Sequence, residues 1–224
     1  MNQSLNSLIT LSDPRSPAAE AFRTLRTNIY FSSLDRTLQT LVVTSAAPSE
    51  GKSTVLANLA VAMAQGDRTT VLVDADLRRP TLHEIFGLKN DVGLTSLFID
   101  KKSAIEPALQ DVGVANLQIL TSGPLPPNPA EVLGSQRMLD VIENLKQRAD
   151  IVLFDAPPVM AVTDASVLGT RVDGVLLVIN SGHTRREHAK RAKAQLEKLN
   201  IHVVGAVLNG TSIDSAMGGY YSAQ

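Results

Sequence analysis

Six continuously apolar runs along the chain alternate with stretches of helical character. Continuous apolar runs, without the apolar–polar alternation of a half-solvated strand, are typical of parallel strands buried on both faces. The runs cover residues 41–44, 71–74, 117–120, 151–155, 174–179 and 203–208. The helices between them are expected at residues 54–65, 130–149 and 185–199. This pattern predicts an α/β domain with a mostly parallel central sheet and helices on both faces.

The two ends of the chain differ in composition from this core. Residues 1–17 are rich in Ser and Pro, which favours extended chain, and an Arg-bearing helix is expected at residues 17–33. Residues 121–130 contain too many prolines for a helix or a central strand, so we expect a rigid loop, or simply a connector. Residues 210–224 are small and polar, as in a flexible tail. We therefore predict a single domain over residues 1–209, followed by that tail.

Composition narrows the class of protein by exclusion. The chain has 224 residues, 44% of them hydrophobic, and its 21 basic and 22 acidic residues give a formal net charge of −1. That balance provides no overall field for an anionic partner, and we expect no nucleic-acid partner. The absence of Cys excludes disulfides, thiolate nucleophiles and Cys-type zinc sites. No apolar stretch approaches the ~20 residues of a membrane helix and no secretory signal is visible, so we expect a soluble, intracellular protein.

A short loop between an apolar strand and a small-residue helix carries the strongest chemical signal. Residues 46–53 follow the pattern A-x-x-x-x-G-K-S, with Ala46 where the commonest form has Gly. In such a loop the backbone N–H groups and the positive end of the following helix surround phosphates, and Lys52 neutralises the β and γ groups. Ser53 supplies a hydroxyl ligand for Mg²⁺. The expected phosphate-binding residues are Pro48, Ser49, Glu50, Gly51, Lys52, Ser53 and Thr54.

Three carboxylates stand at the ends of two further apolar strands. Asp74 and Asp76 lie two residues apart on extended chain, so they point to the same side, and Asp155 has the form of a Walker B aspartate. Taken alone, an Asp-x-Asp pair is more often a helix cap or a surface ion pair. Beside a phosphate loop, such acids suit work on a metal ion or on a hydroxyl proton. Arg78 and Arg79 could bind phosphate, pair with these acids or simply be solvated.

Together these motifs resemble those of the bacterial tyrosine kinases, the BY-kinase family of polysaccharide-regulating enzymes built on a MinD/ParA-like P-loop NTPase fold. Residues 45–54 match the family's Walker A motif, residues 73–80 its Walker A′ motif and residues 154–158 its Walker B motif. Walker A′ is the most specific of the three. The resemblance spans nearly the whole chain and implies an ATP-dependent protein-tyrosine kinase.

The resemblance implies ATP and Mg²⁺ as cofactors and gives roles to the acids. Lys52 and the loop amides would hold the phosphates, while Ser53, Asp76 and Asp155 would hold the metal ion directly or through water. Asp74 is the expected acceptor of the tyrosine proton, and the roles of Asp74 and Asp76 could be exchanged. The expected catalytic residues are Lys52, Asp74 and Asp76.

Two regions outside the site carry further expectations from the resemblance. Glu20, Arg23 and Arg26 lie near one helix face and match the family's E-x-x-R-x-x-R element, which implies packing of subunits into a ring. Tyr220 and Tyr221 occupy the position of the family's C-terminal tyrosine cluster, which a neighbouring subunit phosphorylates. Many relatives have a longer run of tyrosines there.

The resemblance also implies a cellular setting. It implies regulation of exopolysaccharide or capsule synthesis and export, and a separate transmembrane activator whose cytoplasmic tail stimulates the kinase. The chain is then expected in the cytoplasm, recruited to the inner face of the membrane, with protein tyrosines as its substrates.

Two other functional classes and one residue stay open. MinD and ParA ATPase switches carry a signature lysine at the position of Ala47 and a membrane-targeting helix that the tail lacks. A nucleotide-dependent assembly protein without kinase activity is a third interpretation. Asn209 resembles an adenine-reading asparagine of related ATPases, with a plain turn residue as the alternative.

Overall fold

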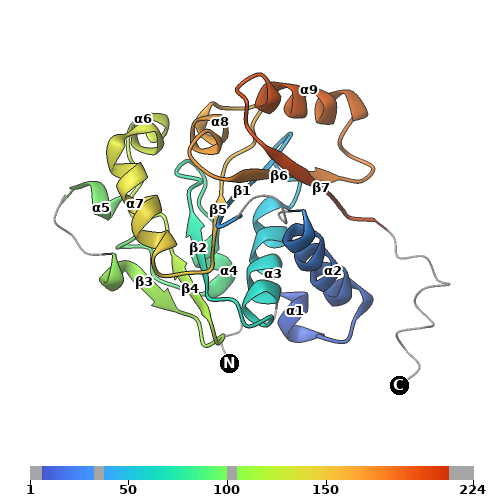
Figure 1. Cartoon of the computed structure of the whole chain (residues 1–224), viewed down its shortest axis with the longest axis horizontal. Coiled ribbons are helices and arrows are strands. Elements are labelled where there is room, and N and C mark those ends of the chain that lie inside the picture. The colour runs from blue at the N-terminus through green and yellow to red at the C-terminus, as the bar shows by residue number, and fades with distance from the viewer. Residues whose placement is uncertain (1–6, 33–37, 100–104, 212–224) are drawn as a thin grey trace.

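The computed structural model describes residues 7–32, 38–99 and 105–211, which form a central sheet with helices on both sides (Figure 1). Over these residues the sheet has seven strands in the spatial order β3-β4-β2-β5-β1-β6-β7. The strands are β1 Thr40–Ser45, β2 Thr70–Asp74, β3 Leu109–Asp111, β4 Leu117–Leu120, β5 Ile151–Asp155, β6 Gly174–Asn180 and β7 Val203–Asn209. Strands β3 and β4 pair antiparallel, and the other neighbours pair parallel. The predicted mostly parallel α/β sheet is confirmed, with the three-residue edge strand β3 as an addition.

Helices on the two faces of the sheet enclose one apolar core each. The helices are α1 Ile9–Ser12, α2 Pro17–Phe31, α3 Lys52–Ala64, α4 Leu82–Phe86, α5 Ser96–Ile99, α6 Pro129–Gly134, α7 Gln136–Lys146, α8 Asp164–Gly169 and α9 Arg186–Glu197, with a 3₁₀ turn at Glu106–Ala108. One core joins α7, α8 and α9 to strand residues such as Val42 and Phe154. The other joins α2, α3 and α4 to residues such as Leu41 and Leu153. Successive strand residues enter opposite cores, which is why the strands are apolar throughout.

The helix predicted at residues 130–149 is wrong as a single helix. α6 ends at Gly134 and α7 begins at Gln136, because Ser135 has extended backbone with φ −76° and ψ 161°. Its hydroxyl accepts a hydrogen bond from the N–H of Met138 at 3.2 Å and so caps α7. A Ser that caps its own backbone neighbours favours a new helix start over a helix interior. The helices predicted at 54–65 and 185–199 are confirmed, with ends that differ by one or two residues.

The prediction of extended chain for residues 1–17 is wrong where the structure describes it. α1 occupies Ile9–Ser12, and both Leu8 and Thr10 are buried. The N–H and hydroxyl of Thr10 donate to Oδ1 of Asn58 at 3.1 and 3.0 Å. Asn58 belongs to α3, in which every residue from Val55 to Ala64 is buried. α1 therefore packs on the helix that follows the phosphate loop, and this long-range contact overrides the local Ser and Pro content.

The carboxyl edge of the sheet brings the candidate residues together. Asp155 at the end of β5 lies opposite Asp74 of β2 on one side and opposite Val43 of β1 on the other. The phosphate loop leaves β1 at the same edge, and Asn209 of β7 pairs with Asn180 of β6. Residues far apart in the sequence thus meet where ligands of parallel sheets bind.

Some expectations fall outside what the structure describes. Tyr220 and Tyr221 lie beyond residue 211, outside the described ranges. Within those ranges, no helix combines the length and the apolar character needed to cross a membrane.

Candidate active site

The loop between β1 and α3 has the backbone of an anion-binding turn. Ser49 and Gly51 have positive φ, 63° and 81°. Such a loop presents successive N–H groups to an anion. Gly51 is the N-cap of α3 and provides no side-chain cap, so the N–H groups of the first helical turn are left to a ligand. Ala46 does not have a positive φ, which explains why it can replace the first Gly of the pattern.

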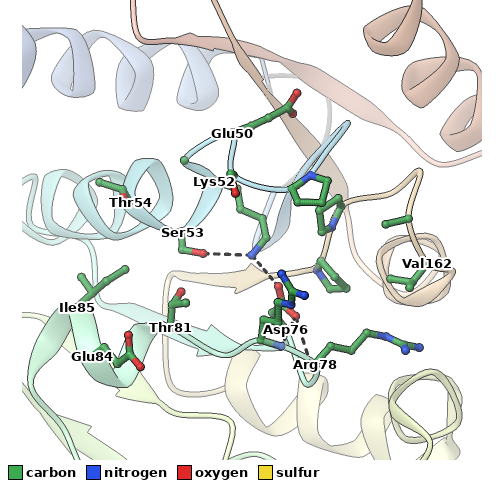
Figure 2. A pocket seen from close by; sticks show the side chains of 17 residues that line it. Glu50, Lys52, Ser53, Thr54, Asp76, Arg78, Thr81, Glu84, Ile85 and Val162 are labelled. Atoms are coloured by element: carbon green, nitrogen blue, oxygen red, sulfur yellow. Dashed lines mark hydrogen bonds and ion pairs between the residues drawn. The ribbon is translucent and has the colours of Figure 1, made fainter. Parts of the chain in front are cut away.

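Lys52 stands at the centre of the site and contacts two carboxylates, those of Asp76 and Asp155. Figure 2 shows Lys52 between Ser53 and Asp76. Its Nζ lies 2.9 Å from Oδ2 of Asp76 and 3.0 Å from Oδ1 of Asp155, and it donates to Oγ of Ser53 at 3.1 Å. The hydroxyl of Ser53 donates to Oδ2 of Asp155. The sequence prediction placed these four residues in one site, and in the structure Lys52 contacts the other three.

Burial shapes the charges of this cluster. Burial alone would lower the pKa of Lys52, but the charges of Asp155 and Asp76 outweigh it and raise that pKa above its ordinary value. Burial raises the pKa of Asp155, against the opposing effects of Lys52 and of the Ser53 hydrogen bond. Lys52 is therefore held protonated, which is the state required for binding phosphate.

Asp74 and Asp76 have different environments despite their spacing. Asp76 contacts Lys52 with Oδ2, and its Oδ1 accepts the N–H of Arg79 at 3.0 Å. Asp74 is fully buried, and its Oδ2 accepts the N–H groups of Thr81 and Leu82 at 3.1 and 3.0 Å. Its Oδ1 has no hydrogen-bond partner among the described residues. Burial and the nearby charge of Asp155 raise the pKa of Asp74 to about 8.

The donor set fits a magnesium ion bound jointly with phosphates. Lys52 faces Asp76 and Asp155, and Asp74 lies next to Asp155 in the sheet. Because three acids surround one lysine, a bound cation would be stabilised here. Within the described ranges, no group of three or more His, Cys, Asp or Glu side chains is arranged to hold a metal ion on its own. Mg²⁺ takes one or two carboxylates plus water and substrate phosphates, a pattern that Ser53, Asp76 and Asp155 can satisfy.

Glu50 supports the loop with its side chain. Its Oε2 accepts the N–H of Ala46 at 2.9 Å, and its Oε1 accepts the hydroxyl of Thr184. The Nδ2 of Asn209 donates to the carbonyl oxygen of Glu50 at 3.0 Å. The loop is thereby tied to Asn209, the last residue of β7, and to the segment after β6. Because both of its carboxylate oxygens are engaged, Glu50 can contact phosphate only through its backbone N–H.

A pocket of about 640 Å³ lies in front of the loop (Figure 2). It is lined by loop residues 48–54, by residues of the segment 76–85 and by residues of the segment 157–162. Such a volume suits a small-molecule site. Arg78 and Arg79 both line it, and Arg78 makes two hydrogen bonds to Asp164 at 2.8 and 3.0 Å. Arg78 was expected to bind phosphate, to pair with the acids at the strand ends or to be solvated. It pairs with an acid, but that acid is Asp164 and none of those three.

Three supporting residues carried no signal that sequence reasoning could use. In the sequence, Asp164 has the character of an ordinary acid at the start of a helix, and Thr184 has that of a loop residue. Thr81, whose N–H binds Asp74, lines the pocket as well. Each acts through a contact with a residue distant in the sequence, or through a turn whose course the sequence does not reveal.

The residues of the E-x-x-R-x-x-R element make contacts within this chain. Nε of Arg23 lies 2.6 Å from Glu20, and its NH2 donates to the carbonyl oxygen of Pro14 at 2.9 Å. NH1 of Arg26 donates to the carbonyl oxygen of Ala62 at 2.8 Å, near the end of α3. Arg26 therefore helps to join α2 to α3, whatever part it plays between subunits.

Comparison with known proteins agrees with this geometry. The family profile described as "ParA: NUBPL iron-transfer P-loop NTPase" matches residues 36–219. Tyrosine-protein kinase YwqD of Bacillus subtilis (strain 168) is 46% identical over 218 residues, covering 97% of this chain and 92% of its own length. Putative tyrosine-protein kinase CapB of Staphylococcus aureus is 38% identical over 208 residues, covering 93% and 91%. The kinase domain of Escherichia coli tyrosine kinase ETK has a TM-score of 0.87 at 31% identity, covering 96% of this chain and 89% of that one.

The fold and site define a P-loop NTPase of the ParA/MinD type. Within that class, the chain belongs to the bacterial tyrosine kinase family. The predicted family is confirmed, and the interpretation as a MinD/ParA-like switch or an assembly protein without kinase activity is not favoured.

Proposed function

We propose that this chain transfers the γ-phosphoryl group of ATP to protein tyrosines, beginning with its own Tyr220 and Tyr221. The observation that carries the proposal is the contact of Lys52 with Asp76 and Asp155 beside a phosphate loop, in a chain of the tyrosine kinase family. Phosphoryl transfer depends above all on positioning and charge neutralisation, and this cluster is suited to both.

The transfer makes one bond and breaks one. The tyrosine Oη bonds to the γ-phosphorus, while the bond from that phosphorus to the β–γ bridging oxygen breaks and its electron pair leaves with ADP. Lys52 and the N–H groups of the loop hold the phosphates and neutralise the charge that develops on them. Mg²⁺ held by Ser53, Asp76 and Asp155 would supply further neutralisation of that charge.

The tyrosine proton passes to a carboxylate, for which we propose Asp74. Its support is the Oδ1 atom without a partner among the described residues and a pKa raised to about 8, since a base works best near the ambient pH. The exchanged assignment has one observation in its favour, because Asp76 lines the pocket and Asp74 is not among the lining residues. Asp76 in turn suits the metal ion, since it already faces Lys52.

The wider proposals extend the family resemblance to the whole chain. We propose that residues 1–209 form a single kinase domain and that residues 210–224 are a flexible tail, phosphorylated in trans within a ring built through α2. Asn209 would lie at the adenine end of the nucleotide, since it contacts the loop at Glu50. The proposed setting is the cytoplasmic face of the membrane, with a transmembrane activator and a role in exopolysaccharide or capsule production.

A mixing experiment tests both the kinase activity and whether one chain phosphorylates the tail of another. The Lys52→Met chain keeps its tail tyrosines as acceptors, while the Tyr220→Phe/Tyr221→Phe chain keeps the site as donor. After incubation with Mg·ATP, mass spectrometry should find phosphate on the tail of the Lys52→Met chain in the mixture and none when either variant is incubated alone.

Other results would contradict the proposal in distinct ways. Phosphate on the Lys52→Met chain alone would remove the role of Lys52. Substantial ATP hydrolysis by the wild-type chain without any phosphotyrosine, even with its activator present, would favour the ATPase-switch interpretation.

A further inference from the structure

Part of the pocket in front of the phosphate loop is not explained by the nucleotide residues. Its floor contains Lys52, Ser53 and Asp76, but its remaining walls come from the segment after β2 and from the turn between β5 and α8 (Figure 2). Asn209, proposed for the adenine end, contacts the loop at Glu50 and is not among the lining residues. This part of the pocket is therefore free for a second substrate next to the phosphates.

The wall from the β5–α8 turn is apolar and fixed. It consists of Pro157, Pro158, Ala161 and Val162. The N–H of Ala161 donates to the carbonyl oxygen of Pro158 at 3.0 Å, and Nε2 of Gln195 in α9 donates to the carbonyl oxygen of Val159 at 2.9 Å. Ile85 of α4 lines the same pocket. A preformed apolar wall of this kind suits the flat face of an aromatic ring.

Thr81 lines this pocket and carries a buried hydroxyl. Its Oγ1 is buried without a hydrogen-bond partner among the described residues, although Thr81 is one of the lining residues. Its N–H donates to Oδ2 of Asp74 at 3.1 Å, so it also stands beside the proposed proton acceptor. A buried hydroxyl without a partner is costly, and a ligand hydroxyl would satisfy it.

The two arginines of the pocket differ in availability. Arg78 is engaged by both carboxylate oxygens of Asp164. Arg79 is exposed and lines the pocket, and over the described ranges no partner of its guanidinium is found. Its backbone is held by the N–H contact with Asp76. Glu84 also lines the pocket, but its side chain is 73% exposed and lies 3.9 Å from Nε2 of His83, and no contact with Arg79 is found among the described residues.

We propose that Thr81, Arg79 and the apolar wall at residues 157–162 form the subsite for the acceptor tyrosine, an inference that rests on the proposed kinase function. The Thr81 hydroxyl hydrogen-bonds the tyrosine hydroxyl, and the wall packs against the ring. Arg79 binds an anionic group next to the tyrosine. That anion is a carboxylate, or the phosphate left on a neighbouring tyrosine by an earlier turnover. Arg79 is thus a specificity-determining residue and Thr81 a substrate-binding one.

Peptide binding tests the subsite without requiring turnover. The protein is the full chain with Tyr220→Phe/Tyr221→Phe, loaded with Mg²⁺ and a non-hydrolysable ATP analogue. Three fluorescent peptides copy residues 217–224 with one acceptor tyrosine. The first carries Tyr221→Phe, the second adds Gly218→Asp and Gly219→Glu, and the third has phosphotyrosine at position 221. Fluorescence anisotropy gives the dissociation constant of each.

The variants separate the two contacts. Thr81→Val keeps the shape and the backbone N–H but removes the hydroxyl, and it should weaken all three peptides about ten-fold, whereas Thr81→Ser should not. Arg79→Ala should weaken the two anionic peptides about ten-fold and leave the neutral one unchanged. Loss confined to the phosphorylated peptide would identify phosphate as the anion, and loss confined to the acidic one a carboxylate. Arg186→Ala, at the start of α9 and outside the pocket lining, is the matched control.

Some outcomes overturn the inference while leaving the kinase proposal intact. If Arg79→Ala weakened the binding of neutral and anionic peptides equally, Arg79 would not be selecting for an anionic group. A Thr81→Val effect seen only in the affinity for the ATP analogue would place Thr81 at the nucleotide, and no peptide binding at all would remove the subsite. Failure of the proposed function is recognised separately, as an absence of phosphotyrosine in the mixing experiment.

Discussion

The guanidinium of Arg78 makes two hydrogen bonds to the carboxylate of Asp164, a residue 86 positions further along the chain. The Asp164 side chain is completely buried, whereas 42% of the Arg78 side chain is exposed. One wall of the pocket is the segment after β2, and another is the turn between β5 and α8. The pair joins the first of these walls to the start of α8, directly after the second. It holds those walls together and leaves Arg79 as the arginine available to a ligand.

Because the two partners differ in burial, their removal should have unequal costs. Arg78→Ala leaves a buried carboxylate without its cation and should lower the free energy of unfolding by about 3 kcal/mol. Asp164→Asn leaves an arginine that water can reach, and we expect a loss of about 1 kcal/mol. Urea denaturation of both variants checks this. Equal losses would mean that the burial of Asp164 does not set the strength of the pair.

Replacing Lys52 should stop phosphate incorporation while leaving the fold in place. Lys52→Met removes the cation that faces Asp76 and Asp155 and that is proposed to neutralise the phosphates, so incorporation should fall by about 100-fold or more. Lys146→Met is a suitable control, because Lys146 lies outside the pocket lining and forms an ion pair with Glu143 on α7. Quantitative phosphotyrosine mass spectrometry measures the loss, and circular dichroism checks the fold. Comparable losses in the two variants would argue against a specific role for Lys52.

Substitution of the two acids of the Walker A′ motif should impair different steps of the reaction. Asp76→Asn weakens the contact with Lys52 and should abolish the tightening of nucleotide binding by Mg²⁺. Asp74→Asn keeps an oxygen for the N–H groups of Thr81 and Leu82, so Mg²⁺-dependent binding should survive while transfer is lost. Fluorescent-nucleotide titrations with and without Mg²⁺, run beside the transfer assay, separate the two. The reverse pattern would support the exchanged assignment.

The sequence predicted those parts of the structure that follow from local pattern. The apolar runs located the six parallel strands. Asp74 and Asp155 at strand ends, and Lys52 in the loop that follows another strand, were enough to predict that they share one edge of the sheet. β3 was not predicted, because a strand of three residues is too short to show a hydrophobic pattern. The break at Ser135 was not predicted either, because the residues around it gave no sign that its side chain would cap a second helix.

The side-chain contacts behind the site depend on distances that no local pattern encodes. The spacing of Asp74 and Asp76 predicted that both point to the same side. It did not reveal that Asp74 is buried against the segment that leads into α4 while Asp76 faces Lys52. The link from Glu50 to Thr184 spans 134 positions, and the partner of Arg78 lies at the start of α8. Such pairs emerge only once the sheet order is known.

The arginines of α2 should separate a ring contact from a contact within the chain. Arg23 pairs with Glu20 on the same helix, so Arg23→Ala should leave stability nearly unchanged while reducing the mass of any oligomer. Arg26→Ala also loses the hydrogen bond to the carbonyl oxygen of Ala62 and should lower the free energy of unfolding by about 1–2 kcal/mol. Light scattering and thermal unfolding measure the two effects. An unchanged mass for Arg23→Ala would argue against a ring built through this residue.

Gly51 and Asn209 should be energetically coupled, because a Cβ at residue 51 would lie 2.3 Å from Nδ2 of Asn209. Gly51→Ala forces Ala into a left-handed conformation and displaces that amide, for an expected loss of about 2–3 kcal/mol of unfolding free energy. Asn209→Ala loses the hydrogen bond to the carbonyl oxygen of Glu50, about 1 kcal/mol. In the double variant the Cβ no longer meets an amide, so the combined loss should be smaller than the sum of the single losses, and what remains is the backbone strain. Denaturant unfolding of all four chains gives the coupling energy, and strictly additive losses would show that the amide yields to the new methyl group without cost.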